Sequence, residues 1–305
     1  MNMGLKITLI VFLVLVLVIF VGLLVVTRSQ GLDIVSHPLD ERPDMEESPE
    51  DFGMVSEKVT VTTEDGLRLY GWYISGTNGA TVMIAHGSPG GRQDGLQEAA
   101  YLNQVGFAVL LGSFRAHDEC DGELISFGYY EQRDLAAWHQ FLLNRSDVDP
   151  QKIGIYGESM GGGTGILYTA DTQGIAALAT GSGFALTQET IETFIQFELD
   201  PPQFLTPILA RFIRFWVEQG ADFSTEDLDT EAVIGQISPR PVLIIHGGQD
   251  DKIGPSCGDQ LYQAAKEPKE LLIIPEAGHV NFEDFQPEVY RKALVDFFTQ
   301  YLLGE

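Results

Sequence analysis

The chain has 305 residues, of which 44% are hydrophobic and 20% charged, and this fits one catalytic domain with an appendage. Its net charge of −26, from 18 basic and 44 acidic residues, excludes nucleic acid as a partner, because a phosphate backbone requires a basic footprint. The two cysteines, Cys120 and Cys257, exclude a disulfide framework and leave open either one bridge or two free thiols. Together with the six histidines they show no metal-ligand spacing, so neither a metal nor another cofactor is expected.

The amino-terminal segment is apolar enough to cross a membrane. Residues 7–26 (ITLIVFLVLVLVIFVGLLVV) carry no charge, and a helix of this length spans about 30 Å, the thickness of a bilayer core. A cleaved signal peptide is the alternative, but its apolar region is usually shorter, and residues 27–30 make a poor cleavage site. We therefore expect a transmembrane signal-anchor over residues 1–28 that contacts the lipid bilayer through residues 7–26. Lys6 and the terminal amine favour a cytoplasmic amino terminus and an extracytoplasmic catalytic domain.

Residues 29–57 are acidic and contain three prolines, which predicts a tether between the membrane and a folded domain over residues 58–303. Within that domain, two alternating runs flank Glu64-Asp65-Gly66 and predict an antiparallel hairpin. Short β-rich runs separated by helix-length segments follow, and they predict an α/β fold with a mostly parallel sheet and helices on both faces. The expected strands are 58–63, 67–74, 81–85, 107–111, 152–156, 175–180, 241–245 and 270–274.

One segment, about residues 183–237, interrupts this alternation. It has more than fifty residues, no convincing strand and many aromatic side chains. We expect two or three helices inserted above the sheet as a lid. The aromatic residues either pack the interior of the lid or line an apolar pocket.

The residues Gly157-Glu158-Ser159-Met160-Gly161 form a G-x-S-x-G motif directly after the expected strand 152–156. A helical stretch rich in small residues follows, and this strand–turn–helix context is the one that a nucleophile elbow requires. Glycines on both sides relieve crowding in the tight turn, and the helix amino terminus directs N–H groups toward a developing anion. We therefore expect Ser159 to be a catalytic nucleophile.

A serine hydroxyl needs a neighbouring base, which is expected late in the chain. His279 fits because it follows the last expected strand and precedes the terminal helix, whereas His86 and His246 are each followed by glycine and indicate turns. The acid that orients the imidazole is expected at the end of strand 241–245. Asp250 and Asp251 both follow that strand, and periodicity does not choose between them.

An oxyanion hole requires two backbone N–H groups that point at the reacting carbonyl oxygen. One is expected from Met160, the residue after the nucleophile. The other is expected in the loop His86-Gly87-Ser88-Pro89-Gly90, where Pro89 has no N–H and Ser88 is therefore the natural donor.

With these motifs in place, residues 58–303 resemble the α/β-hydrolase superfamily, and within it the serine-aminopeptidase-like and acyl-esterase-like branch. The matching motifs are H-G-x-x-G at 86–90, G-x-S-x-G at 157–161, H-G-x-x-D at 246–250 and Gly278-His279. The resemblance implies that Asp250, rather than Asp251, is the acid. It also extends to residues 113–117, where Ala116 stands in place of a usual glycine, and to residues 126–134, whose acids we interpret as structural.

The predicted activity is hydrolysis of carboxylic esters, with thioesters as related substrates, through an acyl-enzyme formed on Ser159. The aromatic lid favours a small-molecule ester with an apolar acyl group as the substrate. The alternatives are a membrane-anchored peptidase of the serine-aminopeptidase type and a non-catalytic binding protein that kept the fold. The sequence does not identify the physiological substrate.

Overall fold

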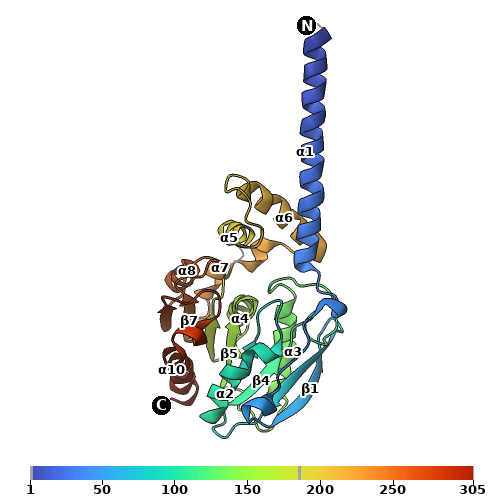
Figure 1. The fold of residues 1–305 in the computed structure, drawn as a ribbon. Helices are drawn as coiled ribbons and strands as arrows, with labels where there is room; N and C mark the ends of the chain where they lie inside the picture. Colours follow the sequence, from blue (N-terminus) through green and yellow to red (C-terminus); the bar gives the residue numbers. More distant parts are fainter. Residues whose placement is uncertain (1–2, 185–186, 305) are drawn as a thin grey trace.

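The computed structural model describes residues 3–184 and 187–304. Residues 1–2, within the expected anchor, and residues 185–186, within the expected lid, lie outside the described residues, as does residue 305. The described chain folds into one twisted sheet with helices on both faces, a helical layer above its edge, and a long amino-terminal helix that rises from that layer (Figure 1).

The sheet has eight strands in the order β1-β2-β4-β3-β5-β6-β7-β8. The first hairpin is antiparallel, β2 also pairs with β4 in antiparallel fashion, and all later neighbours are parallel. Each expected strand is present, with small shifts at the ends, and the α/β-hydrolase fold is confirmed. The strands are β1 (Ser56–Thr62), β2 (Arg68–Ile74), β3 (Thr81–Ala85), β4 (Ala108–Gly112), β5 (Ile153–Glu158), β6 (Ala177–Gly181), β7 (Val242–Gly247) and β8 (Lys269–Ile274).

Two apolar cores lie on the two faces of this sheet, because alternate residues of each strand point to opposite sides. One core receives α3, α4, α7 and α8, with Trp138 as its largest fully buried side chain. The other receives α2 and α10, including Phe297 and Phe298. The helices are α2 (Leu96–Gln104), α3 (Glu131–Leu143), α4 (Met160–Asp171), α7 (Thr230–Ile234), α8 (Cys257–Ala264), α9 (Phe282–Phe285) and α10 (Pro287–Phe298).

Between β6 and β7 the chain forms a helical lid, as its lack of strand character predicted. The lid contains α5 (Gln188–Leu199), α6 (Thr206–Ala221), the 3-10 helix η4 (Thr225–Leu228) and α7. Both long helices are amphipathic, and Ile195, Ile213 and Val217 form an apolar core between them. The lid therefore has a core of its own, separate from the two cores of the sheet.

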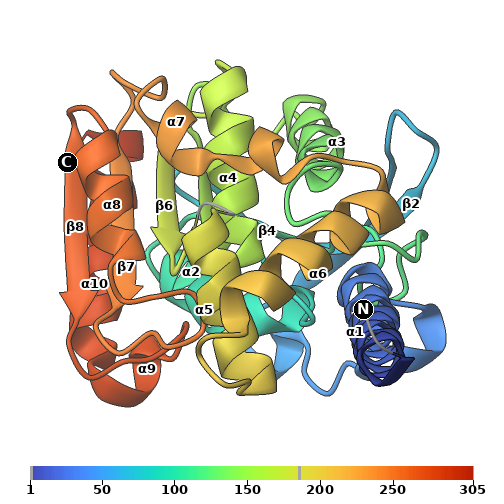
Figure 2. The same ribbon diagram turned by 90° about the horizontal axis from the view of Figure 1, so that it is seen from above.

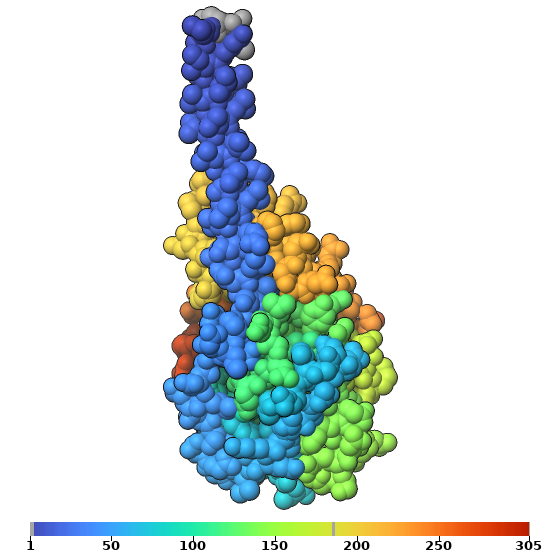
Figure 3. All heavy atoms as spheres, turned by 90° about the vertical axis from the view of Figure 1, so that its right-hand side faces the viewer, coloured from blue at the N-terminus to red at the C-terminus, as the bar shows by residue number. Residues whose placement is uncertain are grey.

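The amino-terminal helix α1 (Met3–Val35) is long and apolar enough to cross a membrane. The helix contains the whole uncharged run 7–26 and continues beyond residue 28. The last two turns continue to Val35 because they pack along α6, where Gly31 allows the two backbones to approach closely (Figure 2). Figure 3 shows this lower part of α1 against the lid, while the upper part extends beyond the rest of the molecule.

The segment after α1 lies against the domain instead of forming a free tether. The Arg42 guanidinium donates hydrogen bonds to the carbonyl oxygens of Asp118, Cys120 and Gly122, at 3.0, 2.7 and 2.5 Å. Two 3-10 helices, η1 (Leu39–Glu41) and η2 (Pro49–Phe52), continue the segment to β1. Proline content thus indicated the irregular backbone correctly, but not its fixed position.

Candidate active site

Ser159 lies in a sharp turn between β5 and α4, with the strained backbone angles φ 50° and ψ −116°. The sequence explains how the turn can be this tight. A Cβ atom at Gly157 would lie 2.3 Å from the carbonyl oxygen of Gly161, and one at Gly161 would lie 2.1 Å from that of Ala85. The Ser159 N–H donates to the Gly181 carbonyl at 2.8 Å, which ties the turn to the neighbouring strand.

The imidazole of His279 connects Ser159 with Asp250. Its Nε2 atom lies 2.8 Å from Ser159 Oγ, and its Nδ1 atom lies 2.9 Å from Asp250 Oδ2. Because a carboxylate only accepts hydrogen bonds, Nδ1 carries the proton and Nε2 presents its lone pair to the serine hydroxyl. The structure therefore brings together three side chains that are 29 and 120 positions apart along the chain.

Asp250 is fully buried, whereas Asp251 is exposed and lines a shallow depression elsewhere on the surface. Burial by itself would raise the pKa of Asp250. The hydrogen bond and electrostatic interaction with the His279 imidazole, together with the Ile253 N–H, outweigh that effect and keep the pKa of Asp250 below its ordinary value. Asp250 therefore stays ionised beside the imidazole, and it is in the position to stabilise an imidazolium.

The loop after β3 brings Ser88 to the same cavity as Ser159 and Met160. His86 fixes this loop, a role that the sequence analysis missed when it assigned His86 to turn structure. The Phe114 N–H donates to His86 Nε2 at 3.0 Å, so Nδ1 carries the proton and donates to the Gly87 carbonyl at 2.6 Å. In a trans peptide the carbonyl and the next N–H point in opposite directions, so holding the Gly87 carbonyl also fixes the direction of the Ser88 N–H.

A second buried histidine, His117, supports the same loop from the other side. Its Nε2 atom lies 3.2 Å from Ser88 Oγ and its Nδ1 atom 2.8 Å from the Arg115 carbonyl. Its ring contacts those of His86 and His37 at 4.9 and 5.0 Å between centroids. Burial lowers the pKa of His117 well below its ordinary value, so the ring is neutral. Its Nδ1 atom carries the proton and donates to the Arg115 carbonyl, and its Nε2 atom accepts from the Ser88 hydroxyl.

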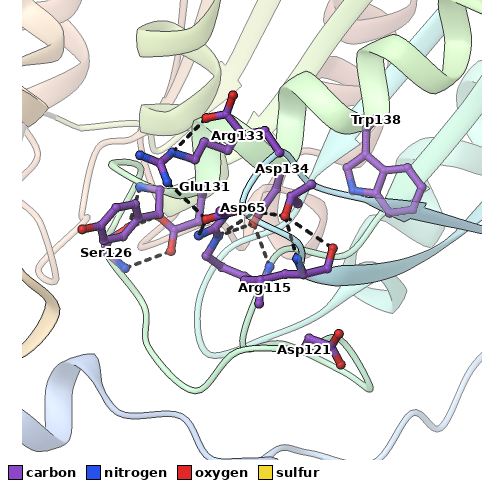
Figure 4. A network of polar contacts seen from close by, with 12 residues as sticks. Asp65, Arg115, Asp121, Ser126, Glu131, Arg133, Asp134 and Trp138 are labelled. Carbon is purple, nitrogen blue, oxygen red and sulfur yellow. Dashed lines mark hydrogen bonds and ion pairs between the residues drawn. The ribbon is translucent and has the colours of Figure 1, made fainter.

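The loop that carries His117 is held by an ionic network that Figure 4 shows in detail. The Arg115 guanidinium bridges buried Asp134, at 2.7 Å, and Asp65, at 2.8 Å. Ala116 adopts a left-handed φ of 58°, a conformation that glycine adopts most readily, which agrees with the glycine that the resemblance implies at this position. The carboxylate of Glu131 accepts hydrogen bonds from the Ser126 and Gly128 N–H groups, so these acids are structural within the described contacts.

A cavity of about 300 Å³ opens on Ser159 and His279 and is lined mainly by apolar side chains. The lid contributes the largest share, including Ile191, Phe194 and Ile213. The end of α1 and the residues after it also line the cavity, at Asp33, Ile34, Ser36 and His37. No local pattern predicted this wall of the cavity, because it depends on contacts between the end of α1 and α6, segments far apart along the chain.

Both cysteines are free and buried, so the open question of a bridge is settled in favour of two thiols. Burial raises the pKa of Cys120 to about 12 and that of Cys257 to about 11. Neither thiol is a reactive nucleophile at neutral pH.

The chain matches a known protein family. The model of the prolyl oligopeptidase family matches residues 97–305, about two thirds of the chain. The chain belongs to the prolyl oligopeptidase family. Since this family match and the structural neighbours agree, the expected membership of the α/β-hydrolase superfamily is confirmed, and the family member described here is a hydrolase.

Three bacterial relatives, each described as an uncharacterised protein, match most of the chain. YfhR of Escherichia coli K12 is 29% identical, with 81% of this chain and 82% of YfhR covered. MT2364 of Mycobacterium tuberculosis is 30% identical, with 79% of each chain covered. YqkD of Bacillus subtilis is 27% identical, with 90% of this chain and 89% of YqkD covered.

Solved structures share the fold at lower identity. The esterase Pf2001 of Pyrococcus furiosus superposes with a TM-score of 0.73 at 23% identity, over 88% of this chain and 98% of the esterase. The esterase EaEST of Exiguobacterium antarcticum gives a TM-score of 0.59 at 16% identity, over 79% of this chain and 99% of that one. At these identities the likeness establishes the fold of this family member, and its substrate must be argued from the site.

Proposed function

We propose that this hydrolase cleaves carboxylic esters, with thioesters as related substrates, through an acyl-enzyme on Ser159. The observation that carries the proposal is the chain of contacts from Ser159 Oγ through His279 to Asp250, at 2.8 and 2.9 Å. A nucleophile, its base and the group that orients the base lie within hydrogen-bonding distance in the order that acyl transfer requires.

The reaction follows from this arrangement. Ser159 Oγ bonds to the carbonyl carbon while its proton moves to His279 Nε2, and the oxyanion is held by the N–H groups of Ser88 and Met160. The bond to the leaving alkoxide breaks as the imidazolium returns the proton to it. Water then repeats the sequence, with His279 as base, and releases the acid. Asp250 remains ionised throughout and stabilises the imidazolium.

The lining of the cavity supports an apolar acyl group as the part of the substrate that binds. Phe194, Ile191 and Val217 surround the space above Ser159, and most of the surface that lines the cavity is apolar. The charged residues at the lining include Glu198, which is 3.9 Å from Lys252 and therefore already has a counter-ion. Asp33 also lines the cavity and makes no ion pair among the described contacts, so it is the apolar lining, and not the charges, that supports an ester with an apolar acyl group.

We also propose that α1 is an uncleaved membrane anchor, that the hydrolase domain begins near residue 56, and that this domain lies outside the cytoplasm. The uncharged run 7–26, and Lys6 on the amino-terminal side of it, support this orientation. A reporter that is active only outside the cytoplasm, fused after residue 305, tests the orientation. Activity supports it, and activity of a cytoplasm-dependent reporter at the same position contradicts it.

A fluorophosphonate probe tests the proposed nucleophile. The wild-type chain should be labelled and Ser159→Ala should not, while Ser256→Ala, at an exposed serine outside the cavity, should be labelled like the wild type. Equal labelling of the Ser159→Ala and wild-type chains would contradict the proposal. A series of p-nitrophenyl esters of increasing acyl length then defines the acyl group.

Peptidase activity is the second candidate, and the family to which the chain belongs is its support, because that family is described by prolyl oligopeptidase. Aminoacyl and prolyl anilides, assayed beside p-nitrophenyl esters on the same protein, separate the two activities. A higher kcat/KM for the anilides would favour the peptidase. Full function of the Ser159→Ala chain in cells would favour a non-catalytic binding protein.

A further inference from the structure

We propose that the outward side of the lid lies in the bilayer beside α1, so that the enzyme receives its ester from the membrane as a single-chain lipid. This surface, here called the lid face, consists of Phe204, Ile208 and Phe215. The proposal rests on the proposed ester hydrolysis and on the proposed membrane anchor.

The lid face is an exposed apolar patch formed by one side of α6 and the turn before it. The side chains of Phe204, Ile208 and Phe215 are 76%, 46% and 49% exposed. Ile208 and Phe215 lie seven residues apart on the same side of α6, with exposed Arg211 between them, and Phe204 lies in the turn that leads into the helix. Large apolar side chains gathered on one face of a soluble domain mark a contact surface, for a membrane or for another molecule.

The charge pattern around the lid face differs from that of the rest of the chain. Residues 201–217 (PPQFLTPILARFIRFWV) contain no acid, although the chain as a whole has 44. Their only charges are Arg211 and Arg214, and acids resume at Asp200 and Glu218 on either side. An acid-free segment can approach lipid phosphates, and the apolar stem of exposed Arg211 can lie along a buried face while its charged end reaches the headgroups. Arg214 instead pairs with Glu218 at 3.0 Å and lines the cavity.

Contacts between α6 and α1 set the depth of the lid face. The rings of Phe20 and Phe212 meet edge to face, with centroids 6.3 Å apart. Phe20 lies six positions before residue 26, the end of the uncharged run, and six residues of α-helix rise about 9 Å. If residues 7–26 occupy the hydrocarbon core, then Phe212 lies below the surface of that core, and the lid face on the same helix enters the membrane with it.

The next turn of α6 has the residues typical of a membrane surface. The Arg28 guanidinium lies 5.7 Å from the centre of the Trp216 ring, and the backbone at Gly31 touches the Trp216 side chain. Tryptophan and arginine are enriched where the hydrocarbon core meets the headgroups. Two contacts between α1 and α6 thus match the expected depth in the bilayer. The contact of Phe20 with Phe212 lies in the hydrocarbon core, and the contact of Arg28 with Trp216 lies at its surface.

The inner side of the same helix lines the cavity above Ser159, through Ile213 and Val217. One helix therefore separates the catalytic cavity from the proposed lipid phase. A cavity of about 300 Å³ is at the small end of the range for ligand pockets, which fits one acyl chain. The geometry points to a monoacylglycerol or a lysophospholipid as the substrate class, since both carry one acyl ester and reside in bilayers.

The position of the lid face can be measured without any assay of activity. Ile208→Cys and Phe215→Cys, carried by the full chain in phosphatidylcholine nanodiscs, are labelled with a polarity-sensitive NBD dye. The native thiols are buried and have raised pKa values, so they give a low background, measured on the wild type. Val105→Cys and Val289→Cys are matched controls. The Val105 side chain, at the end of α2, is 44% exposed, and the Val289 side chain, in α10, is 45% exposed.

We expect dyes at 208 and 215 to emit at shorter wavelength than those at 105 and 289, and to be quenched by doxyl-labelled lipid. A dye at Val18→Cys, within the apolar run, reports whether α1 is inserted. Quenching at 18 with water-like emission at 208 and 215 would overturn the proposal while leaving the anchor intact. Water-like emission at all three positions would overturn the anchor and this proposal together.

The substrate is tested with the variant Phe204→Ser/Ile208→Ser/Phe215→Ser. Its kcat/KM for monooleoylglycerol in nanodiscs should fall roughly tenfold or more, because apolar contact with lipid is lost. Its kcat/KM for soluble p-nitrophenyl acetate should stay within about twofold, because none of the three residues lines the cavity. The matched variant Val105→Ser/Leu143→Ser/Val289→Ser, with similarly exposed side chains, should keep both activities.

Failure of this proposal is distinguishable from failure of the proposed function. Equal losses on both substrates, or none on either, would overturn membrane delivery of the substrate. Fluorophosphonate labelling of Ser159 is measured on the same samples, and its absence would instead contradict the proposed hydrolysis, whatever the dyes at 208 and 215 report.

Discussion

The edge of the sheet that carries Ser159 and the layer formed by the lid and α1 are held together in different ways. Around Ser159, directional hydrogen bonds fix nearly every group: Asp250 accepts from His279 and from the Lys252 and Ile253 N–H groups, at 2.9 to 3.2 Å. In the upper layer, apolar faces and ring contacts predominate, such as Phe20 on Phe212.

This difference separates chemistry from substrate choice. A directional network at the sheet tolerates little movement, because a misplaced donor or base slows acyl transfer by orders of magnitude. Apolar contacts have no preferred direction, so the lid can shift against α1 at small cost. We therefore expect substitutions at the sheet edge to act on kcat and those at the lid–anchor contact to act on KM.

The sharpest test at the sheet edge compares two adjacent aspartates. Asp250→Asn should lower kcat for a p-nitrophenyl ester by about 10⁴-fold, because an amide no longer holds His279 in the required tautomer. Asp251→Asn, at an exposed position one residue away, should change kcat by less than about twofold. Steady-state kinetics with active-site titration measures both. A comparable loss in the two variants would contradict the assignment of Asp250.

His86 tests whether the oxyanion loop depends on its buried support. His86→Ala removes the donor to the Gly87 carbonyl, so the Ser88 N–H loses its fixed direction, and kcat should fall by about 10²-fold. KM should change little, because His86 is not among the residues that line the cavity. His139→Asn is the control for loss of a buried imidazole. His139 lies in α3, away from the cavity, and its ring forms a hydrogen bond with the Tyr168 hydroxyl.

Glu98 tests the electrostatics beneath the sheet edge. Burial raises its pKa to about 7, and the Tyr290 hydroxyl donates to its carboxyl group at 2.9 Å. Between the ordinary pKa of 4.5 and 7 the native state binds more protons than the unfolded chain, so the free energy of unfolding should fall as pH rises through this window.

Glu98→Gln cannot titrate, so its free energy of unfolding should not show this fall. The difference in free energy of unfolding between Glu98→Gln and the wild type should therefore be larger at pH 8 than at pH 5, by on the order of 1–3 kcal/mol. Denaturant unfolding at the two pH values measures this, with Glu288→Gln, at an exposed site, as the control. An unchanged pH dependence in Glu98→Gln would contradict the prediction.

The smallest expected effect is at the contact between α1 and α6. A Cβ atom at Gly31 would lie 2.6 Å from Trp216 Cβ, so Gly31→Val should push α6 outward at a cost of about 1–3 kcal/mol and raise KM with little change in kcat. Gly22→Val, where an added Cβ meets no protein atom within 4 Å, is the matched control in the same helix. Equal KM values in the two variants would show that the contact does not shape the cavity.

The catalytic constellation was readable in the sequence because its determinants are local. A glycine on each side of Ser159 is required by the crowding of a single turn, and the strands before Asp250 and His279 show as short apolar runs. Parallel strands present their carboxyl ends at one edge, so residues that follow different strands meet there. Their catalytic roles stay predictions until the kinetic tests are made.

Other features depended on tertiary contacts. Periodicity could not separate Asp250 from Asp251, because only folding decides which adjacent carboxylate is buried against an imidazole. The supporting roles of His86 and His117 were missed, since their partners are 28 and 29 positions away. The expected tether was placed on the domain by Arg42, whose acceptors are carbonyl groups that any sequence provides.

The sequence by itself therefore determined the class of fold, the positions of the strands along the chain, a helix apolar enough to span a membrane and the residues proposed for catalysis, because strand periodicity, turn sterics and helix hydropathy act within a few residues. Only the tertiary structure decided that α1 continues to Val35, that its end forms a wall of the cavity, and that α6 faces both the cavity and α1. These arrangements arise from apolar packing between distant segments, and such packing is non-directional, so no local pattern specifies which surfaces meet.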